Sequence, residues 1–340
     1  MNKVLTVVVP TYNMEYYLKN TLDSLIVSPS LMQFLEVIVV NDGSKDKSSL
    51  IAHEYVKQYP DSFRVIDKEN GNYGSCVNRG LKEAKGKYIK ILDADDQYNS
   101  EVFSSFLSYL NGCDSDMVLS DFVQVNPEGN VINHIHYGLD TTRDLSCKDL
   151  PKEKLFLNPA VTYKTDNLRR IKYHQTEGIS YTDQEWVFMP MLSVHSIRYF
   201  SGIVYKYLIG REGQTMDPLV FKKNLSQIMQ VTMSIMHCFE VHHKSIDNQH
   251  YAFFVNRIEL ACHVVYDRFL IVNDLDLDIR DLNYFDNRIK QEYPCVWSIM
   301  NSMRISPRIN YRYIKDYRRF HKNCYPGILL YRFYRKLKTD

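Results

Sequence analysis

The sequence Ile89-Lys90-Ile91-Leu92-Asp93-Ala94-Asp95-Asp96 is a short apolar run that ends in three carboxylates. An apolar run of this length is typical of a buried β-strand. Carboxylates that follow such a strand lie in the crevice beyond the strand ends, where open α/β sheets bind ligands. They repel one another unless protons or a cation intervene, and Mg²⁺ or Mn²⁺ prefers oxygen ligands. The stretch therefore predicts either a site for a divalent cation or a solvated loop in which an aspartate caps the next helix.

The composition is that of an ordinary soluble chain. Its 340 residues are 45% hydrophobic and 24% charged, with a net charge of +2, and the length suggests about two domains. The 7 cysteines are scattered without a CxxC pair, which favours reduced thiols over a disulfide framework or a zinc site. The N-terminus runs into a strand pattern without a signal peptide, and no apolar stretch approaches the roughly 18–20 residues that span a bilayer. We therefore expect a cytoplasmic protein.

Apolar β-branched runs alternate with segments of helical periodicity in the first hundred residues. The predicted strands are 4–9, 35–40, 63–66 and 88–92, and the predicted helices are 14–26, 48–59 and 76–84. This alternation is typical of right-handed βαβ units and a parallel sheet. Pro10, Asp42, Gly74 and Asp93–Asp96 lie beyond strand ends or in the following loops. We expect them to converge on one edge of the sheet as a nucleotide site.

Four short motifs follow one another along this half of the chain. They are Val-Val-Val-Pro-Thr-Tyr-Asn (7–13), Val-Asn-Asp-Gly-Ser (40–44), the glycine-rich segment ending in Asn78-Arg79-Gly80, and Leu-Asp-Ala-Asp-Asp (92–96). Each motif is weak alone, but the four in this order resemble the nucleotide-sugar domain of the inverting family-2 glycosyltransferases. The resemblance implies an α/β, Rossmann-like domain with the GT-A fold.

The resemblance also implies roles for individual residues. Thr11 and Tyr12 would line the pocket of the base, and Asp42 would hydrogen-bond to the base. Asp93 would approach the ribose or the sugar, and Asp95 would bind a Mn²⁺ or Mg²⁺ ion that bridges the diphosphate. The other motif residues expected at the nucleotide sugar are Pro10, Gly74, Asn78 and Ala94.

The chain departs from the family pattern where Cys76-Val77-Asn78 replaces the common Ala-Arg-Asn. The arginine that can contact the donor is missing, and Arg79 would point elsewhere on a helix. The donor's identity is therefore open, and Asn78 is either a donor contact or an amide on the helix surface. Asp96 also has two interpretations, since it either assists the metal or caps a helix.

The middle of the chain is predicted to continue the sheet. Residues 117–122 and 131–137 would form a hairpin across the turn Pro127–Asn130. His134 and His136 would share one face of it, and we expect surface histidines because no further metal ligand is evident. The polar stretch 141–159 would cross the acceptor side of the cleft.

The segment Gly178–Trp186 contains the predicted catalytic base. Thr182 and Glu185 match a capping box, Thr-x-x-Glu, before a helix at 186–192. Asp183 is not needed for that box. An acidic pair opens a helix at this place in the family, so the resemblance makes Asp183 the base that deprotonates the acceptor hydroxyl. The alternative is a carboxylate that only stabilises the helix N-terminus.

The stretch from Tyr205 to Thr215 resembles the family's closing strand and the flexible loop over the diphosphate. Gly210 and Gly213 would permit movement of the loop. Arg211 would neutralise the departing phosphate through bidentate hydrogen bonds, or it is an ordinary exposed arginine. Trp186 could stack on an acceptor sugar, although a tryptophan on an apolar helix face belongs more often to the core.

The C-terminal third is predicted to be helical, with periodic segments at 221–241 and 251–272 and a connection at 274–286. The tail, residues 304–340, has eleven Lys or Arg residues against two Asp or Glu, with tyrosines among them. This pattern is typical of a helix on an anionic membrane surface or of a solvated basic face. No RNA-binding motif accompanies it, so we expect no nucleic-acid partner.

We therefore predict two domains. Residues 1–216 would be the GT-A domain, with a nucleotide-sugar half at 1–98 and an acceptor half at 99–216, and residues 217–340 would be a helical region. The predicted activity is inverting, metal-dependent transfer from a nucleoside diphosphate sugar, with UDP the expected nucleotide. The acceptor would be a glycan or a lipid-linked saccharide at the inner face of the membrane. The alternatives are a sugar-nucleotide-binding subunit without turnover and a nucleotidyltransferase, which would release pyrophosphate.

Overall fold

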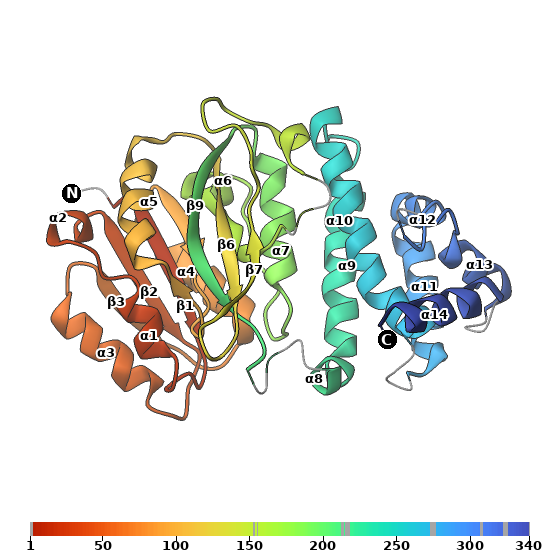
Figure 1. The fold of residues 1–340 in the computed structure, drawn as a ribbon, viewed down its shortest axis with the longest axis horizontal. Helices are drawn as coiled ribbons and strands as arrows, with labels where there is room; N and C mark the ends of the chain where they lie inside the picture. Colours follow the sequence, from red (N-terminus) through yellow and green to blue (C-terminus); the bar gives the residue numbers. More distant parts are fainter. Residues whose placement is uncertain are drawn as a thin grey trace. The chain divides into compact units, whose positions relative to one another are not determined.

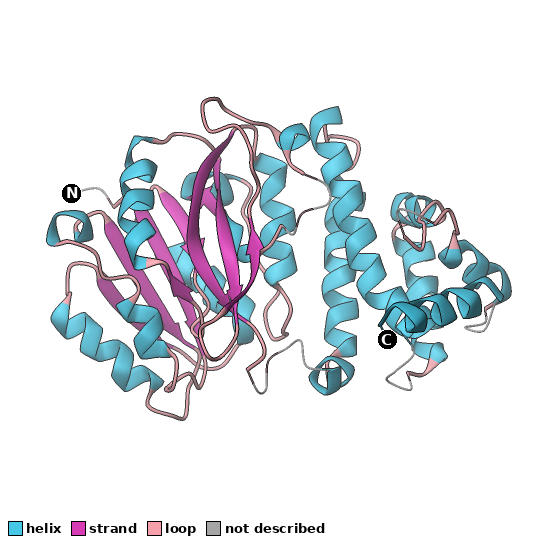
Figure 2. Cartoon of the chain, viewed as in Figure 1, coloured by secondary structure: helices cyan, strands magenta, loops and turns pink. Residues whose placement is uncertain are grey.

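The computed structural model describes residues 3–151, 154, 156–211, 214, 218–272, 277–306, 309–321 and 326–339. The chain divides into two compact units, Met1–Gln214 and Thr215–Asp340 (Figure 1). The first unit combines strands and helices, and the second is built from helices (Figure 2).

The first unit is organised around one sheet. Its strands are β1 (Leu5–Thr11), β2 (Leu35–Asn41), β3 (Phe63–Asp67), β4 (Tyr88–Ile91), β5 (Gln97–Tyr98), β6 (Met117–Val125), β7 (Val131–Ile135), β8 (Val161–Lys164) and β9 (Ile197–Leu208). Its helices are α1 (Leu18–Asp23), α2 (Pro29–Met32), α3 (Ser48–Gln58), α4 (Asn72–Glu83), α5 (Ser100–Gly112), α6 (Thr165–Arg170) and α7 (Asp183–Phe188). Short 3₁₀ turns lie at Cys147–Asp149, Asn158–Ala160 and Met189–Ser193.

The strands lie in the order β3-β2-β1-β4-β8-β6-β9-β5, and β7 pairs with β6. β1 pairs in parallel with β2 and β4, and β2 with β3, so the predicted βαβ sheet and the predicted β6–β7 hairpin are confirmed. β8 is antiparallel to both β4 and β6, so β6 and β9 run in the direction of β4. The carboxyl ends of β1, β2, β4, β6 and β9 therefore share one edge of the sheet.

Burial explains why the first strands are so apolar. β1 and β2 are buried along their whole length, as expected for central strands covered on both faces. α4 packs on β1 at Gly80, where a Cβ would lie 2.4 Å from Val8 Cγ1. α4 begins at Asn72, earlier than the predicted start at 76, and this brings the glycine-rich loop into its first turn.

Lys90 is a fully buried lysine in the middle of β4. Its Nζ donates hydrogen bonds to the carbonyl oxygens of Pro159 (2.6 Å) and Val161 (3.0 Å), and it lies 5.8 Å from the centre of the Tyr205 ring. Burial lowers the pKa of Lys90 to about 7, because an ammonium group is costly to remove from water. The side chain joins β4 to the segment that leads into β8.

Because the pKa of Lys90 is lowered on folding, we expect the unfolding free energy of the protein to depend on pH. Between its folded pKa of about 7 and its unfolded value of 10.5, the unfolded chain binds more protons, so stability rises with pH in that window. From pH 7 to pH 9 the wild type should gain about 2 kcal/mol of unfolding free energy relative to Lys90→Met. Urea unfolding in a Trp297→Phe background, where Trp186 is the remaining tryptophan, measures this difference. Equal pH slopes in the two proteins would contradict the prediction.

The second unit contains the helices of the C-terminal third. They are α8 (Pro218–Lys223), α9 (Leu225–His242), α10 (Asn248–Asp267), α11 (Ile279–Glu292), α12 (Pro294–Met300), α13 (Tyr313–Phe320) and α14 (Pro326–Thr339), with a π-helical turn at Arg268–Val272 after α10. The two predicted long helices correspond to α9 and α10. The predicted connection at 274–286 is wrong, because α11 already begins at Ile279, where Leu282, Phe285 and Ile289 form a buried stripe.

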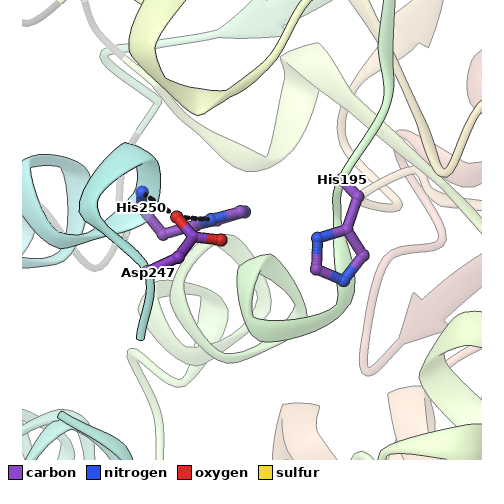
Figure 3. Close-up of side chains that lie close together, drawn as sticks. All are labelled: His195, Asp247 and His250. Carbon is purple, nitrogen blue, oxygen red and sulfur yellow. Dashed lines mark hydrogen bonds and ion pairs between the residues drawn. The ribbon is translucent and has the colours of Figure 1, made fainter. Parts of the chain in front are cut away.

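The start of α10 is fixed by a side-chain cap. Asp247 accepts hydrogen bonds from the backbone N–H groups of Gln249 (2.8 Å) and His250 (3.0 Å), and its Oδ1 lies 2.8 Å from His250 Nδ1 (Figure 3). His195, also labelled in Figure 3, belongs to the first unit, where its backbone N–H donates to Asp116.

Among the described residues, no helix is long and apolar enough to cross a membrane.

Candidate active site

The loops after β1 and β2 hold each other in place. Asn13 adopts a left-handed backbone with φ of +54°, donates its N–H to Ser44 Oγ (3.0 Å), and accepts from the N–H of Lys45 (2.8 Å). Thr11 is buried, and its hydroxyl donates to Val9 O, whereas Tyr12 is 47% exposed. Of the two predicted base-pocket residues, Tyr12 therefore offers a surface, and Thr11 shapes the backbone beneath it.

Asp42 is buried at the end of β2 and has a cationic partner that the sequence did not single out. Its Oδ1 accepts from Lys68 Nζ (2.6 Å) and from the N–H of Gly71 (2.9 Å). Lys68 also donates to Ser75 Oγ (2.9 Å). Lys68 directly follows β3, so its position beyond a strand end was the available signal. The pair links the ends of β2 and β3 to the first turn of α4.

The carboxylates after β4 have different environments. Asp96 is buried and accepts from the Tyr205 hydroxyl (2.6 Å) and the Leu208 N–H (2.7 Å), so both of its oxygens hold the end of β9. It is not a helix cap, because the residue that precedes α5 is Asn99. Burial and the neighbouring Asp95 raise the pKa of Asp96 well above its usual value.

Asp93 is held by a tyrosine from the glycine-rich loop. Its Oδ1 accepts from the Tyr73 hydroxyl (2.8 Å), and its N–H donates to the Tyr205 oxygen (3.2 Å). Burial and Asp95 raise the pKa of Asp93 to about 7, and the hydrogen bond from Tyr73 partly opposes this rise. Tyr73 stands inside the predicted loop but was given no role there. Ala94 is buried, and its carbonyl accepts from the Thr21 hydroxyl (2.9 Å).

Asp95, the predicted metal ligand, faces Arg211. Arg211 Nε lies 2.5 Å from Asp95 Oδ2, both side chains are largely buried, and the guanidinium lies 5.5 Å from the centre of the Tyr17 ring. Arg211 is therefore not an ordinary exposed loop arginine. It comes from the loop after β9, which Gln214 closes by donating to Leu208 O (2.8 Å) and accepting from the Gly210 N–H (2.7 Å). Gly213, the other predicted hinge glycine, lies outside the described residues.

Asp183 is the first residue of α7 and lies close to the carboxylate cluster. Its charge contributes to the raised pKa values of Asp93, Tyr73 and Tyr207. The charge of the predicted base thus acts on Asp93, a predicted donor-site aspartate that lies 90 positions away in the sequence.

The predicted capping box is wrong. The Thr182 side chain makes no cap hydrogen bond and instead accepts from Gln175 Nε2 (2.9 Å). The buried Glu185 accepts from both the N–H and the hydroxyl of Thr176 (2.7 Å each). A buried carboxylate needs such donors, and the nearby segment supplies them in place of the helix end. The predicted helix at 186–192 starts earlier and ends at Phe188.

Residues 174–178 form a strap over α4. Asn78 accepts from the Gln175 N–H (2.8 Å) and donates to Gln175 O and Glu177 Oε1 (2.8 Å each), so it is not a solvated surface amide. A Cβ at Gly74 would lie 2.0 Å from Thr176 O, so the missing side chain allows the strap to approach. The strap continues into α7 and thereby positions Asp183.

Trp186 belongs to the core. It is fully buried, with the Tyr163 and Tyr173 rings at its edges (5.3 and 5.5 Å between centres). It is therefore not an acceptor-stacking surface.

His136 is an exposed histidine, as predicted, and its Nδ1 lies 2.5 Å from the buried Asp121.

The carboxylates fit a hard divalent cation. Asp95 offers an oxygen that already faces a positive group, and Asp93 lies beside it. Mg²⁺ and Mn²⁺ bind through one or two carboxylates and take their remaining oxygens from phosphates and water. Asp96 uses both oxygens to hold Tyr205 and Leu208 at the end of β9, so Asp95 is the ligand that we favour.

Comparison with known proteins agrees with this arrangement. The family model Glycosyl transferase family 2 matches residues 6–174. The minor teichoic acid biosynthesis protein GgaB of Bacillus subtilis is 30% identical over 171 residues, which are 50% of this chain and 19% of GgaB. The poly(ribitol-phosphate) beta-N-acetylglucosaminyltransferase TarS of Staphylococcus aureus is 26% identical over 220 residues, covering 62% of this chain and 36% of TarS. This chain thus spans well under two thirds of the length of these relatives.

A solved structure shows the same fold. The crystal structure of S. aureus TarS residues 1–349 superposes with a TM-score of 0.65 at 21% identity, covering 97% of this chain and 89% of that one. The four motifs, the strand order and the family match agree with one another. The chain therefore carries a glycosyl transferase family 2 domain with the GT-A fold.

Proposed function

We propose that this chain transfers a sugar from a UDP-sugar, of which UDP-N-acetylglucosamine is the first candidate, to a hydroxyl group of a glycan. The observation that carries the proposal is that Asp93 and Asp95 follow β4 beside Arg211, and that the charge of Asp183 at the start of α7 acts on Asp93. S. aureus TarS has been solved in complex with UDP-GlcNAc, which supports this choice of donor. The half through residue 98 would bind the donor, and the half at 99–216 the acceptor.

The donor site would work by positioning. Asp42, held by Lys68, would accept a hydrogen bond from the base, and the exposed ring of Tyr12 would stack on it. Asp93, oriented by Tyr73, would bind the ribose or the sugar. When bound, Mn²⁺ or Mg²⁺ at Asp95 would neutralise charge on the diphosphate. Arg211 would then exchange its bond to Asp95 for one to the phosphate oxygens.

Transfer would be a single inverting displacement. The Asp183 carboxylate takes the proton of the acceptor hydroxyl as the acceptor oxygen bonds to the anomeric carbon. The bond from that carbon to the diphosphate oxygen breaks on the opposite side, and UDP leaves with the electron pair. Because the attack comes from the opposite face, the anomeric configuration is inverted.

The acceptor would be a glycan or a lipid-linked saccharide. GgaB is named a minor teichoic acid biosynthesis protein, and TarS is named a poly(ribitol-phosphate) beta-N-acetylglucosaminyltransferase. Ribitol is a polyol, so a poly(ribitol-phosphate) chain offers hydroxyl groups as acceptors. We therefore propose a polyol-phosphate or glycan chain as the class of acceptor.

A thermal-shift screen tests the donor. The melting temperature should rise with a UDP-sugar in the presence of Mn²⁺, more than with GDP-sugars, because a ligand selective for the native state stabilises it. Release of UDP on addition of acceptor then tests transfer. Release of pyrophosphate, or binding without any turnover, would overturn the proposal.

Tyr73→Phe tests the positioning of Asp93. Loss of a hydrogen bond to a charged group should lower kcat/KM for the donor about tenfold while leaving the melting temperature nearly unchanged. Tyr109→Phe is the matched control. The Tyr109 hydroxyl, on α5, accepts a hydrogen bond from Arg198 of β9 and so lies outside the proposed donor site. Equal kinetics of the two variants would show that Tyr73 has no part in donor binding.

A further inference from the structure

α14 exposes a stripe of large apolar side chains. Leu329 is 46% exposed, Leu330 70%, Phe333 62% and Tyr334 42%. Leu329 and Phe333 are four residues apart, as are Leu330 and Tyr334, and Leu330 and Phe333 are three apart. Side chains at these spacings are neighbours on a helix, so the four form one continuous surface, the α14 stripe. Single exposed apolar residues are common, but a stripe of four on one helix marks a contact surface.

The opposite side of α14 is seated on its own unit. Ile328 is fully buried, and Arg332 Nε donates to Leu270 O (2.9 Å) in the π-helical turn after α10. A Cβ at Gly327 would lie 2.4 Å from the Tyr311 ring, so the helix begins in close contact with the chain beneath it. The stripe therefore faces outward from an anchored helix.

α13, the other helix of the basic tail, buries several of its large side chains. In α13, Tyr313, Ile314 and Tyr317 are fully buried. Arg318 is nearly buried as well, pairs with Asp286 (2.9 Å), and lies 3.3 Å from the centre of the Trp297 ring. Tyr313, Tyr317 and Arg318 of α13 thus belong to the core, whereas Lys315, Arg319 and Phe320 are exposed. Phe320 is a single exposed apolar side chain on α13, so the larger exposed apolar surface of the tail is that of α14.

We propose that the α14 stripe docks on the surface of an anionic lipid bilayer. α14 contains Arg332, Arg335, Lys336 and Lys338 and no acidic residue. A helix that combines basic residues, no acidic residue and an exposed apolar stripe has the composition of helices that lie in the interface of membranes with negatively charged lipids. A 14-residue helix is about 21 Å long, shorter than the roughly 30 Å hydrocarbon core, so it lies on the bilayer.

The charge of α14 favours a lipid bilayer over a second copy of this chain as the partner of the α14 stripe. A symmetric contact through the stripe would bring together two α14 helices whose sequences beyond the seated Arg332 hold Arg335, Lys336 and Lys338 and no acidic residue. Like charges at such a contact repel, whereas an anionic headgroup layer neutralises them. The inference concerns a surface of the second unit, so it does not depend on the proposed sugar transfer.

Vesicle flotation of the full chain tests the proposal. The wild type should float with vesicles of equal parts phosphatidylglycerol and phosphatidylcholine, should not float with phosphatidylcholine alone, and should be released by salt. Leu330→Gln with Phe333→Gln should weaken the partitioning at least about tenfold. Lys336→Gln with Lys338→Gln should weaken it and reduce its salt dependence.

Leu260→Gln is the matched control, because Leu260 on α10 is an equally exposed leucine outside the stripe. It should float like the wild type, and all variants should keep the wild-type melting temperature. Failure of the wild type to bind anionic vesicles would overturn the proposal, as would unchanged binding of the stripe variant. Concentration-dependent dimers that only the stripe variant loses, without vesicle binding, would assign the stripe to a second copy instead.

Discussion

Asp183→Asn is expected to lower the rate of sugar transfer about a thousandfold, the size of effect found when a general base is lost. The amide has nearly the shape of the carboxylate but cannot take the acceptor proton. Asp183 opens α7, where its charge acts on Asp93, and Glu185 of the same helix is held by Thr176 of the strap at 174–178. Binding of UDP-sugar should therefore persist. The measurement is kcat for UDP release with saturating acceptor, together with the donor Kd.

Asp166→Asn is the matched control for this variant. Asp166 is likewise an acidic residue in the first turn of a short helix, α6, and its side chain is 85% exposed. It should transfer sugar at the wild-type rate. If Asp183→Asn also does so, Asp183 is only a charge at a helix N-terminus, and the catalytic base must be sought elsewhere.

Asp95→Asn is expected to abolish the metal-dependent part of donor binding, with affinity for Mn²⁺ in the presence of UDP falling at least about a hundredfold. A neutral amide is a poor ligand for a hard cation, and the buried Arg211 would lose its ionic partner as well. Titration calorimetry of UDP with and without Mn²⁺ measures the loss.

Asp96→Asn separates the two adjacent carboxylates. Since Asp96 accepts from Tyr205 and Leu208, its replacement should lower the melting temperature and leave the requirement for metal intact. The assignment of the metal to Asp95 would be falsified if Asp95→Asn bound Mn²⁺ like the wild type while Asp96→Asn did not.

The sequence predicted those parts of the fold that depend on local pattern. The strands at 4–9, 35–40 and 88–92 are apolar except for Thr6, Glu36 and Lys90, as expected for strands that are buried on both faces of a sheet. The polar residues after them had to meet at one edge because the strands are parallel. Pairings across long separations carry no such local signal. Tyr205 reaches Asp96 across 109 positions, and Asn78 reaches Gln175 across 97.

The errors have physical causes. The Thr182–Glu185 pair has the spacing of a capping box, but Thr176 and Gln175 compete for the same side chains and bury them. α13 has the composition of a surface helix, yet Arg318 finds both an acidic partner and an aromatic ring within the unit. In each case the local sequence pattern was present, but the side chains bind partners from distant parts of the chain instead.

The position of β8 has a consequence for how the chain folds during synthesis. β8 lies between β4 and β6, although it follows both in the chain. Until residues 161–164 leave the ribosome, β4 and β6 each present an unpaired edge, and such edges invite pairing with other chains. The sheet closes through contacts distant in sequence, which form slowly. A nascent chain that ends before β8 is therefore expected to need protection from aggregation.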